Sequence, residues 1–307
     1  MKTRKKFLYI TIIVFVGVGV LFGPQYYIRF QKTKQERLLF EARKVAWQAL
    51  RQKITNEISQ FKGETGIVIK DLKTGWELFY EKAKLFPSAS LAKIPIMAAC
   101  FIAAEEGRLK LDRQVALKYT DKLTGSGVLK DMSVGTTFNV ERLIGLMIYD
   151  SDNTATNIVT NLVGINYLNS AFKSFGLKNT DLSRKIADYQ LRDKGIENYT
   201  IAEDMVLLLE KIYRRTLGNK RVSDQCISML KLARLNDRIP KYLPVEITIA
   251  HKTGLERDVC HDVGIVFTHK GDFIIAVLTK DVDSASTLSK EFIANVSLHA
   301  YNYFAQF

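Results

Sequence analysis

The sequence has few of the residues that build disulfide scaffolds or metal sites. Its 307 residues include only three cysteines, Cys100, Cys226 and Cys260. The number is odd, and no two of them have the spacing of metal ligands. The four histidines form no metal-binding cluster either. Because Cys100 falls in an apolar stretch, its thiol is expected to pack as a small hydrophobic group. These absences exclude a disulfide-rich fold, and we expect no metal and no other cofactor.

Proline is also scarce, and no proline-rich linker, internal repeat or low-complexity tract divides the chain. Hydrophobic residues make up 47% of the chain and charged residues 25%. This composition suits one large domain or two closely packed subdomains, and it excludes a disordered chain. The net charge of +13 leaves three kinds of partner open: nucleic acid, an anionic membrane surface, or an acidic polymer such as a cell wall.

The N-terminal residues favour the membrane and the cell wall, so nucleic acid is not expected as a partner. Residues 1–6 are basic, residues 7–22 are apolar without a charge, and extension to Ile28 reaches membrane-spanning length. This predicts a cytoplasmic basic tail at 1–6 and a transmembrane signal-anchor at 7–28, in the bacterial cytoplasmic membrane. No small-x-small cleavage site stands out, which favours an uncleaved anchor over a signal peptide whose removal would secrete the protein. The rest of the chain is expected outside the cytoplasm.

The remaining sequence alternates between helical and strand patterns. Residues 29–60 have apolar side chains at helical spacing, which predicts a juxtamembrane amphipathic helix. A mostly helical region covers about 90–235, and strand patterns lie on both sides of it, at residues 66–71, 76–80, 245–252, 264–269 and 273–280. We predict an α/β (α+β) fold in which a five-stranded antiparallel sheet is flanked by N- and C-terminal helices and joined to a large all-helical lobe. The crevice between sheet and lobe is the expected binding site.

A candidate nucleophile stands at the start of the helical region. Ser90 follows turn-forming residues and precedes an apolar run, so it is expected to cap a buried helix. Lys93 lies three residues later and therefore on the same helix face. A hydroxyl beside an amine that burial keeps partly neutral is an activated nucleophile. The pattern alone is weak, since similar pairs on solvated helix faces occur at Ser59/Lys62, Ser170/Lys173 and Ser228/Lys231.

Two more short motifs follow in order. Ser151-Asp152-Asn153 comes after an apolar helix, and Lys252-Thr253-Gly254 closes a predicted strand. A second Lys-Thr-Gly, at residues 73–75, lies in a hairpin turn that precedes Ser90, and both its order and its context set it aside. With these three motifs, the chain resembles the class A β-lactamase-like serine hydrolases of the penicillin-recognising serine enzyme superfamily. The resemblance covers roughly residues 60–305 and implies that residues 61–307 form a β-lactamase-like catalytic domain.

The resemblance implies catalytic roles for three side chains: Ser90 and Lys93 of the first motif, and Ser151 of the second. Ser90 would attack a carbonyl and form an acyl-enzyme. Lys93 would take its proton or tune the path by which it leaves, and Ser151 would relay a proton to the leaving nitrogen. Such acyl transfer needs a nucleophile, a base and an oxyanion site close together.

The resemblance implies substrate-binding roles for five further positions. Asn153 would hold Lys93 and the substrate amide. Lys252 and Thr253, followed by Gly254, would engage the substrate carboxylate by charge and hydrogen bonding. The backbone N–H of Leu255 would form the oxyanion hole together with that of Ser90, where fixed donors act strongly on developing charge.

One family feature is altered in this sequence. Class A enzymes carry Glu-x-x-Leu-Asn in a loop between the second and third motifs, and its Glu activates the water that releases the acyl group. The best match here is Asp188-Tyr189-Gln190-Leu191-Arg192, in which the acid is one methylene shorter. Asp188 is therefore either the deacylation base or a loop residue that pairs with Arg184 or Arg192. Asn157 matches the family residue that braces this loop.

The sequence thus predicts a membrane-anchored serine hydrolase of the class A β-lactamase type. β-Lactams would acylate Ser90, and the acyl-enzyme would be hydrolysed, with slow release as one outcome. Two alternatives remain: a cell-wall D,D-peptidase of the penicillin-binding kind, and a peptidoglycan- or β-lactam-binding module without turnover. The expected partners are a β-lactam or a D-Ala-D-Ala-type peptide, the cytoplasmic membrane through residues 7–28, and an anionic cell wall.

Overall fold

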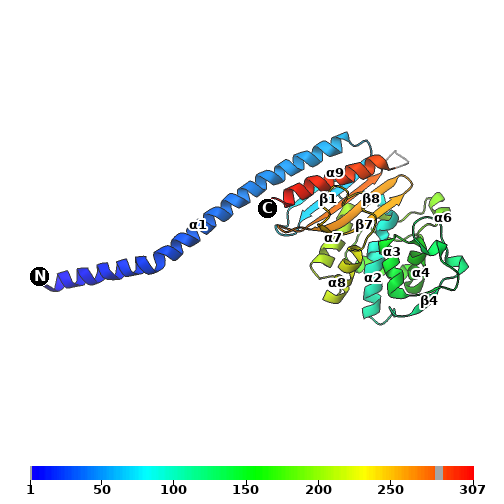
Figure 1. Ribbon diagram of the computed structural model, residues 1–307, viewed down its shortest axis with the longest axis horizontal. Coiled ribbons are helices and arrows are strands. Elements are labelled where there is room, and N and C mark those ends of the chain that lie inside the picture. The colour runs from blue at the N-terminus through cyan, green and yellow to red at the C-terminus, as the bar shows by residue number, and fades with distance from the viewer. Residues whose placement is uncertain (1, 281–285) are drawn as a thin grey trace. The chain divides into compact units, whose positions relative to one another are not determined.

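The computed structural model describes the backbone of residues 2–280 and 286–307, and within these ranges the side chains of residue 29 and of residues 31 onward. It separates into two units, Met1–Arg51 and Gln52–Phe307. The first unit holds most of helix α1 (Lys2–Gln60), which is blue in Figure 1. The second unit carries all of the sheet and every predicted site residue.

The prediction of a transmembrane helix at residues 7–28 is wrong. Helix α1 continues as one element from Lys2 to Gln60, so the apolar stretch runs without a break into a segment rich in charged residues. In the part of the chain that the structure describes, no helix has both the length and the apolar character that crossing a membrane requires. The side chains of residues 7–28 lie outside the described residues.

The centre of the second unit is a five-stranded antiparallel sheet in the order β2-β1-β9-β8-β7. Strands from both ends of the domain pair in it, because β1 lies against β9 with Glu64 opposite Lys280. The predicted sheet is therefore present. Its strands are β1 (Glu64–Asp71), β2 (Glu77–Tyr80), β7 (Thr248–Glu256), β8 (Val259–Phe267) and β9 (Phe273–Lys280).

Strands β7 and β8 differ from their predicted bounds. β7 continues through Thr253 and Gly254 to Glu256, and β8 begins at Val259 instead of residue 264. Almost every residue of β8 is buried, polar ones included, so no alternation of polar and apolar residues marks where it begins. The longer hairpin brings the third motif and the residues after it alongside Ser90.

Helices cover both faces of the sheet. Helix α9 (Thr287–Phe304) packs on one face, where Phe292 stacks on Phe61 and Phe304 stacks on Phe273, each pair with ring centroids 4.3 Å apart. The other face is covered by α7 (Ala202–Tyr213) and α8 (Lys220–Leu230), as Figure 1 shows.

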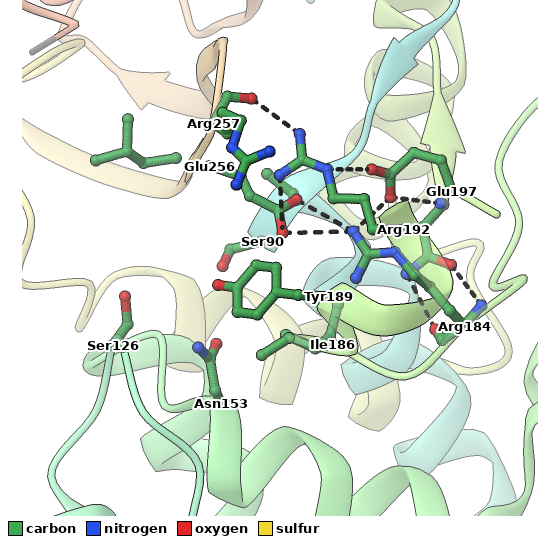
Figure 2. A pocket seen from close by; sticks show the side chains of 15 residues that line it. Ser90, Ser126, Asn153, Arg184, Ile186, Tyr189, Arg192, Glu197, Glu256 and Arg257 are labelled. Carbon is green, nitrogen blue, oxygen red and sulfur yellow. Dashed lines mark hydrogen bonds and ion pairs between the residues drawn. The ribbon is translucent and has the colours of Figure 1, made fainter. Parts of the chain in front are cut away.

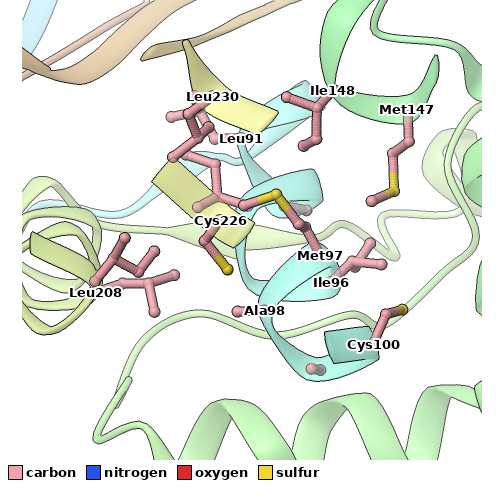
Figure 3. Close-up of a cluster of buried hydrophobic side chains, with 14 of the residues drawn as sticks. Leu91, Ile96, Met97, Ala98, Cys100, Met147, Ile148, Leu208, Cys226 and Leu230 are labelled. Atoms are coloured by element: carbon pink, nitrogen blue, oxygen red, sulfur yellow. The ribbon is translucent and has the colours of Figure 1, made fainter. Parts of the chain in front are cut away.

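The lobe beside the sheet is built around α2 (Lys93–Glu105). From Lys93 to Phe101 every residue of α2 is buried. Figure 3 shows Met97 and Cys100 of α2 in the same apolar cluster as Met147 and Leu230. All three cysteines are buried, and burial raises the pKa of Cys100 and Cys226. The other lobe helices are α3 (Val140–Tyr149), α4 (Asn153–Val163), α5 (Ile165–Ser174) and α6 (Tyr189–Asp193).

The lobe is not all-helical, which corrects the prediction. It also contains two small two-stranded sheets and three 3₁₀ turns. These elements are too short to show as periodic patterns in the sequence, because two or three residues cannot display an alternation. They are β3 (Phe86–Pro87) with β6 (Tyr199–Thr200), β4 (Gln114–Ala116) with β5 (Thr137–Asn139), and the turns η1 (Ala89–Ala92), η2 (Tyr119–Asp121) and η3 (Leu129–Asp131).

Candidate active site

Ser90 lies in the turn that leads into the central helix of the lobe. It belongs to η1 and not to the cap of an α-helix, because α2 begins at Lys93 with Ala92 as its N-cap. Ala89, with φ +44°, bends the chain just before it. The Ser90 side chain faces a cavity of about 360 Å³ (Figure 2). Within the described residues its hydroxyl makes no hydrogen bond, so the oxygen is not engaged by another group.

Lys93 is fully buried one residue beyond that turn. Its Nζ donates to the Ser151 carbonyl oxygen at 2.6 Å, to Asn153 Oδ1 at 2.9 Å and to Ser151 Oγ at 3.1 Å. Burial, and second the charge of Lys252, hold the pKa of Lys93 well below its ordinary value. The amine therefore holds its proton less tightly than an ordinary lysine side chain does. The structure joins it to Ser151 and Asn153, and no hydrogen bond to Ser90 occurs among the described residues.

Ser151 connects the two lysines. It lies between α3 and α4 with φ +53°, a left-handed backbone that non-glycine residues rarely adopt. Its Oγ accepts from Lys252 Nζ at 2.9 Å as well as from Lys93 Nζ at 3.1 Å. A hydroxyl between two amines can pass a proton from one side of a substrate to the other. Strained backbone of this kind is frequent at functional sites.

Asp152 organises the wall opposite the sheet, a role that the sequence reasoning missed. Its Oδ1 caps α4 by accepting from Ala155 N at 2.8 Å, and its Oδ2 accepts from Val128 N and Leu129 N at 2.7 and 2.8 Å. These bonds fix the loop that carries Ser126 to the cavity. The signal was its place directly before an apolar helix, where an N-cap aspartate is favoured.

Lys252 closes the other end of the site from strand β7. It is buried, and its Nζ also donates to its neighbour, the Thr253 carbonyl oxygen, at 2.7 Å. Burial lowers the pKa of Lys252 to about 7, the Asp262 carboxylate acts against this, and Arg238 adds to it. The side chain is thus cationic at mildly acid pH and partly neutral above pH 7. A charged Lys252 suits a substrate carboxylate.

The β7 residues after Lys252 approach Ser90 closely. A Cβ on Gly254 would lie 3.2 Å from Leu91 Cγ, which is tighter than ordinary packing, so a larger residue there would require Leu91 to shift. Leu255 and Ser90 both line the cavity. Their backbone N–H groups are therefore the available pair for an oxyanion.

Asp188 does not lie in the cavity wall. Its Oδ1 accepts from Leu191 N at 3.1 Å and caps the short helix α6, while its neighbours Ala187 and Tyr189 line the cavity. It forms no ion pair with Arg184 or Arg192, so neither predicted role of Asp188 has the geometry it needs.

Asn157 braces this loop at a different residue. Its Nδ2 donates to the Ile186 carbonyl oxygen at 2.9 Å, and its Oδ1 accepts from Ile186 N at 3.1 Å. The Ile186 side chain faces the cavity beside Tyr189 (Figure 2). The match to the family's loop motif in the sequence analysis centres on Asp188, two residues after Ile186. It follows the acidic side chain and not the residue that Asn157 holds.

Four charged side chains join this loop to the end of β7 (Figure 2). Arg184 Nη2 lies 2.6 Å from Glu197 Oε1 and 3.3 Å from Glu256 Oε2. Arg192 Nε lies 3.0 Å from Glu197 Oε2, and its Nη1 lies 3.5 Å from Glu256 Oε1. We call these four residues the charge network. Both carboxylates of the cavity wall are thus shared between two guanidinium groups.

Comparison with known proteins shows which family the chain belongs to. The model of the beta-lactamase enzyme family matches residues 49–304. The chain belongs to the beta-lactamase enzyme family. Ser90 lines the cavity together with Asn153, which accepts from Lys93, and Ser151 joins Lys93 to Lys252. This beta-lactamase family member is a serine β-lactamase-like hydrolase.

Individual relatives of this beta-lactamase family member include enzymes and a penicillin-binding protein. Beta-lactamase VEB-1 of Pseudomonas aeruginosa is 24% identical over 268 residues, which is 82% of this chain and 89% of VEB-1. The β-lactamase structure from Sphaerobacter thermophilus has a TM-score of 0.77 at 27% identity and covers 85% of this chain and 98% of its own. A PBP-A mutant, solved as an acyl-enzyme complex with penicillin G, has a TM-score of 0.78 at 29% identity and covers 85% and 97%.

The described residues were also inspected for side chains that could bind a metal ion together. Within residues 29, 31–280 and 286–307, no three His, Cys, Asp or Glu side chains gather as a metal site requires.

Proposed function

We propose that β-lactams acylate Ser90 and that the acyl group leaves slowly. The observation that carries the proposal is the asymmetry of the cavity. On one side, Lys93, Ser151 and Lys252 form a connected set of proton-transfer groups. On the other side stands Ile186, where a water would have to be activated to release the acyl group.

The acylation half uses the groups that the motifs supply. Ser90 Oγ attacks the lactam carbonyl, and neutral Lys93 accepts its proton. The proton then travels through Ser151 Oγ to the leaving nitrogen, while Lys252 and Thr253 hold the carboxylate. The lowered pKa of Lys93, caused first by burial, supports its part as base. A positioned general base or acid contributes about 10²–10⁴ in rate.

The deacylation half lacks a free carboxylate. Glu197 and Glu256 are bound in the charge network, and Asp188 caps α6. Losing a general base slows hydrolysis by about 10²–10⁴, which turns a rapidly cleared intermediate into a long-lived adduct. Slow release of this kind also suits the second candidate, a D,D-peptidase that β-lactams inactivate. A D-Ala-D-Ala peptide presents the same amide and terminal carboxylate to Ser90 and Lys252.

We further propose that the domain acts outside the cytoplasm. Cell-wall peptides with D-Ala-D-Ala ends occur there, and the basic and apolar N-terminal residues suit export. The net charge of +13 supports contact with anionic cell-wall polymers. Cell fractionation of the full chain tests this, because recovery in the cytoplasmic fraction would contradict it.

The proposed chemistry is tested by intact mass after treatment with benzylpenicillin. The expected result is a gain of one penicillin mass, lost over minutes to hours, and no gain in Ser90→Ala. Ser126→Ala is the matched control, because it removes a hydroxyl from the same cavity and should still form the adduct. A chromogenic cephalosporin should give a burst followed by slow turnover. Rapid steady turnover contradicts slow release, and no adduct with no drug consumed supports the non-turnover module.

A second assay separates the two hydrolases. Release of D-alanine from an acyl-D-Ala-D-Ala peptide, abolished by Ser90→Ala, supports the D,D-peptidase. A chain that forms the penicillin adduct but leaves the peptide intact is the slow β-lactamase.

A further inference from the structure

His261 is a fully buried histidine of strand β8 that the proposed mechanism does not use. Its Nε2 lies 2.8 Å from the Pro87 carbonyl oxygen, and its Nδ1 lies 3.1 Å from Thr279 N. A backbone N–H can only donate, so Nδ1 accepts from Thr279. The ring is neutral near pH 7, because burial lowers the pKa of His261 to about 4. A neutral imidazole carries one proton, which is therefore on Nε2 and is donated to Pro87.

Pro87 belongs to the segment that leads directly to Ser90. It pairs with β6 in a small two-stranded sheet, and the next residue, Ser88, donates its backbone N–H to the Asn198 carbonyl oxygen at 2.7 Å. These contacts come from the lobe, whereas the bond from His261 comes from the five-stranded sheet. The segment that precedes the nucleophile is therefore held by hydrogen bonds from the lobe and from the sheet.

The same imidazole lies beside the strand that carries the second oxyanion donor. His261 is opposite Gly254 in the pairing of β8 with β7. A Cβ added to Gly254 would lie 3.2 Å from His261 Cδ2 and 3.4 Å from its Cβ, so the histidine already fills the space next to this glycine. Gly254 directly precedes Leu255, and η1 packs on both β7 and β8. His261 is thus in place three residues before Ser90 on one element and one residue before Leu255 on the other.

Resting on the proposed acylation of Ser90, we infer that His261 is a positioning residue that sets the spacing of the Ser90 and Leu255 backbone N–H groups. The two donors come from separate elements, η1 and β7, so their separation depends on what lies between those elements. His261 bonds to the segment before η1 and fills space beside β7. Oxyanion donors act on charge that develops only in the transition state, so altered spacing should slow acylation without weakening substrate binding.

The test compares three substitutions at His261 by the kinetics of benzylpenicillin adduct formation. The adduct rate against drug concentration, from rapid quenching and intact mass, gives the limiting acylation rate constant and the dissociation constant of the preceding complex. His261→Leu removes the donor, and His261→Asn has an amide too short to reach Pro87. Both should lower the limiting rate constant by about tenfold to a hundredfold and leave the dissociation constant within about threefold. His261→Gln, whose amide nitrogen replaces Nε2, should recover most of the rate.

His299→Gln is the matched control, because it removes an imidazole from α9, where Nε2 lies 3.1 Å from Glu57 Oε1. It should change neither constant, and a loss equal to that of His261→Asn overturns the inference. An unchanged limiting rate constant in His261→Asn also overturns it. So does a His261→Gln variant as slow as His261→Asn, because the loss would then come from disturbed packing and not from the missing donor. If His261→Leu does not fold by circular dichroism, the Asn and Gln variants decide.

A boronic acid that forms a tetrahedral adduct with Ser90 provides a second measurement. Because it resembles the transition state, its affinity should fall in His261→Asn by about the same factor as the limiting rate constant. An unchanged affinity contradicts a role of His261 at the oxyanion donors. Absence of any penicillin adduct in the unsubstituted protein overturns the proposed function and this inference together. Adducts that form with an unchanged limiting rate constant in His261→Asn overturn only this inference.

Discussion

Asn157 holds both backbone polar groups of Ile186, donating to its oxygen at 2.9 Å and accepting from its nitrogen at 3.1 Å. This pair of bonds fixes the loop so that the apolar Ile186 side chain faces the cavity that Ser90 also lines. Asn157 therefore braces the loop, but the residue that it holds, Ile186, has an aliphatic side chain that cannot accept a proton. We therefore attribute the proposed slow release to the identity of this one side chain, since the loop that carries it is held in place.

A carboxylate at position 186 is expected to speed release. In Ile186→Glu the lifetime of the benzylpenicillin adduct should shorten by about tenfold to a hundredfold, because a general base would face the ester. Intact mass against time after removal of free drug gives the lifetime. Ile186→Gln, which has the same shape without the base, should not shorten it. Asp188→Ala should also leave it unchanged, and a longer lifetime in that variant would return Asp188 to the mechanism.

Removing the hydroxyl between the two lysines should slow acylation. Ser151→Ala takes away the group that accepts from Lys93 and Lys252, so the proton loses its path to the leaving nitrogen. The second-order acylation constant should fall by about 10²–10³, with the adduct still forming at Ser90 on long incubation. A rate within about threefold of the unsubstituted protein would remove Ser151 from proton transfer.

Acylation should depend on pH through both lysines. Lys93 works when neutral, so the rate rises as pH increases through its lowered pKa. Lys252 works when charged, and since burial lowers its pKa to about 7, carboxylate binding is present below pH 7 and lost above it. The acylation constant should therefore fall on the alkaline side of a bell-shaped profile. Because a guanidinium stays charged, Lys252→Arg should move that alkaline fall to higher pH. An unmoved fall would assign it to another group.

The charge network should contribute to stability. Glu197→Gln leaves Arg184, which is only 2% exposed, and Arg192 with one carboxylate in place of two. Breaking a buried ion pair costs about 3 kcal/mol, which lowers Tm by about 6–12 °C in a domain of this size. Thermal unfolding followed by circular dichroism measures it. Glu203→Gln, which breaks the exposed pair with Lys82, should cost less than about 1 kcal/mol. Equal losses in the two variants would contradict a structural role for the network.

The sequence was sufficient to predict the sheet, and it singled out side chains that the structure joins by hydrogen bonds. Short motifs in a fixed order carry this information. Lys93 and Lys252 are far apart in the chain, yet the Nζ atoms of both lie within 3.1 Å of the Ser151 hydroxyl. Strands β1, β2 and β9 were also visible, because their apolar runs end at turn residues.

Features that depend on distant partners could not be predicted. The pairing of Arg184 and Arg192 with Glu256 joins residues about seventy positions apart, and no local pattern marks it. Asp188 was chosen because its side chain is acidic, whereas the loop is positioned by a contact from Asn157 in another helix. The membrane-spanning prediction failed because a window of apolar residues does not show where the surrounding helix ends.

The left-handed backbone of Ser151 stores strain beside two buried amines. Glycine would occupy φ +53° with less backbone strain, so Ser151→Gly would relieve strain while it removes the hydroxyl that accepts from Lys93 and Lys252. The same change would take an acceptor from two buried amines, so relief of backbone strain and satisfaction of the lysines oppose each other at this one position.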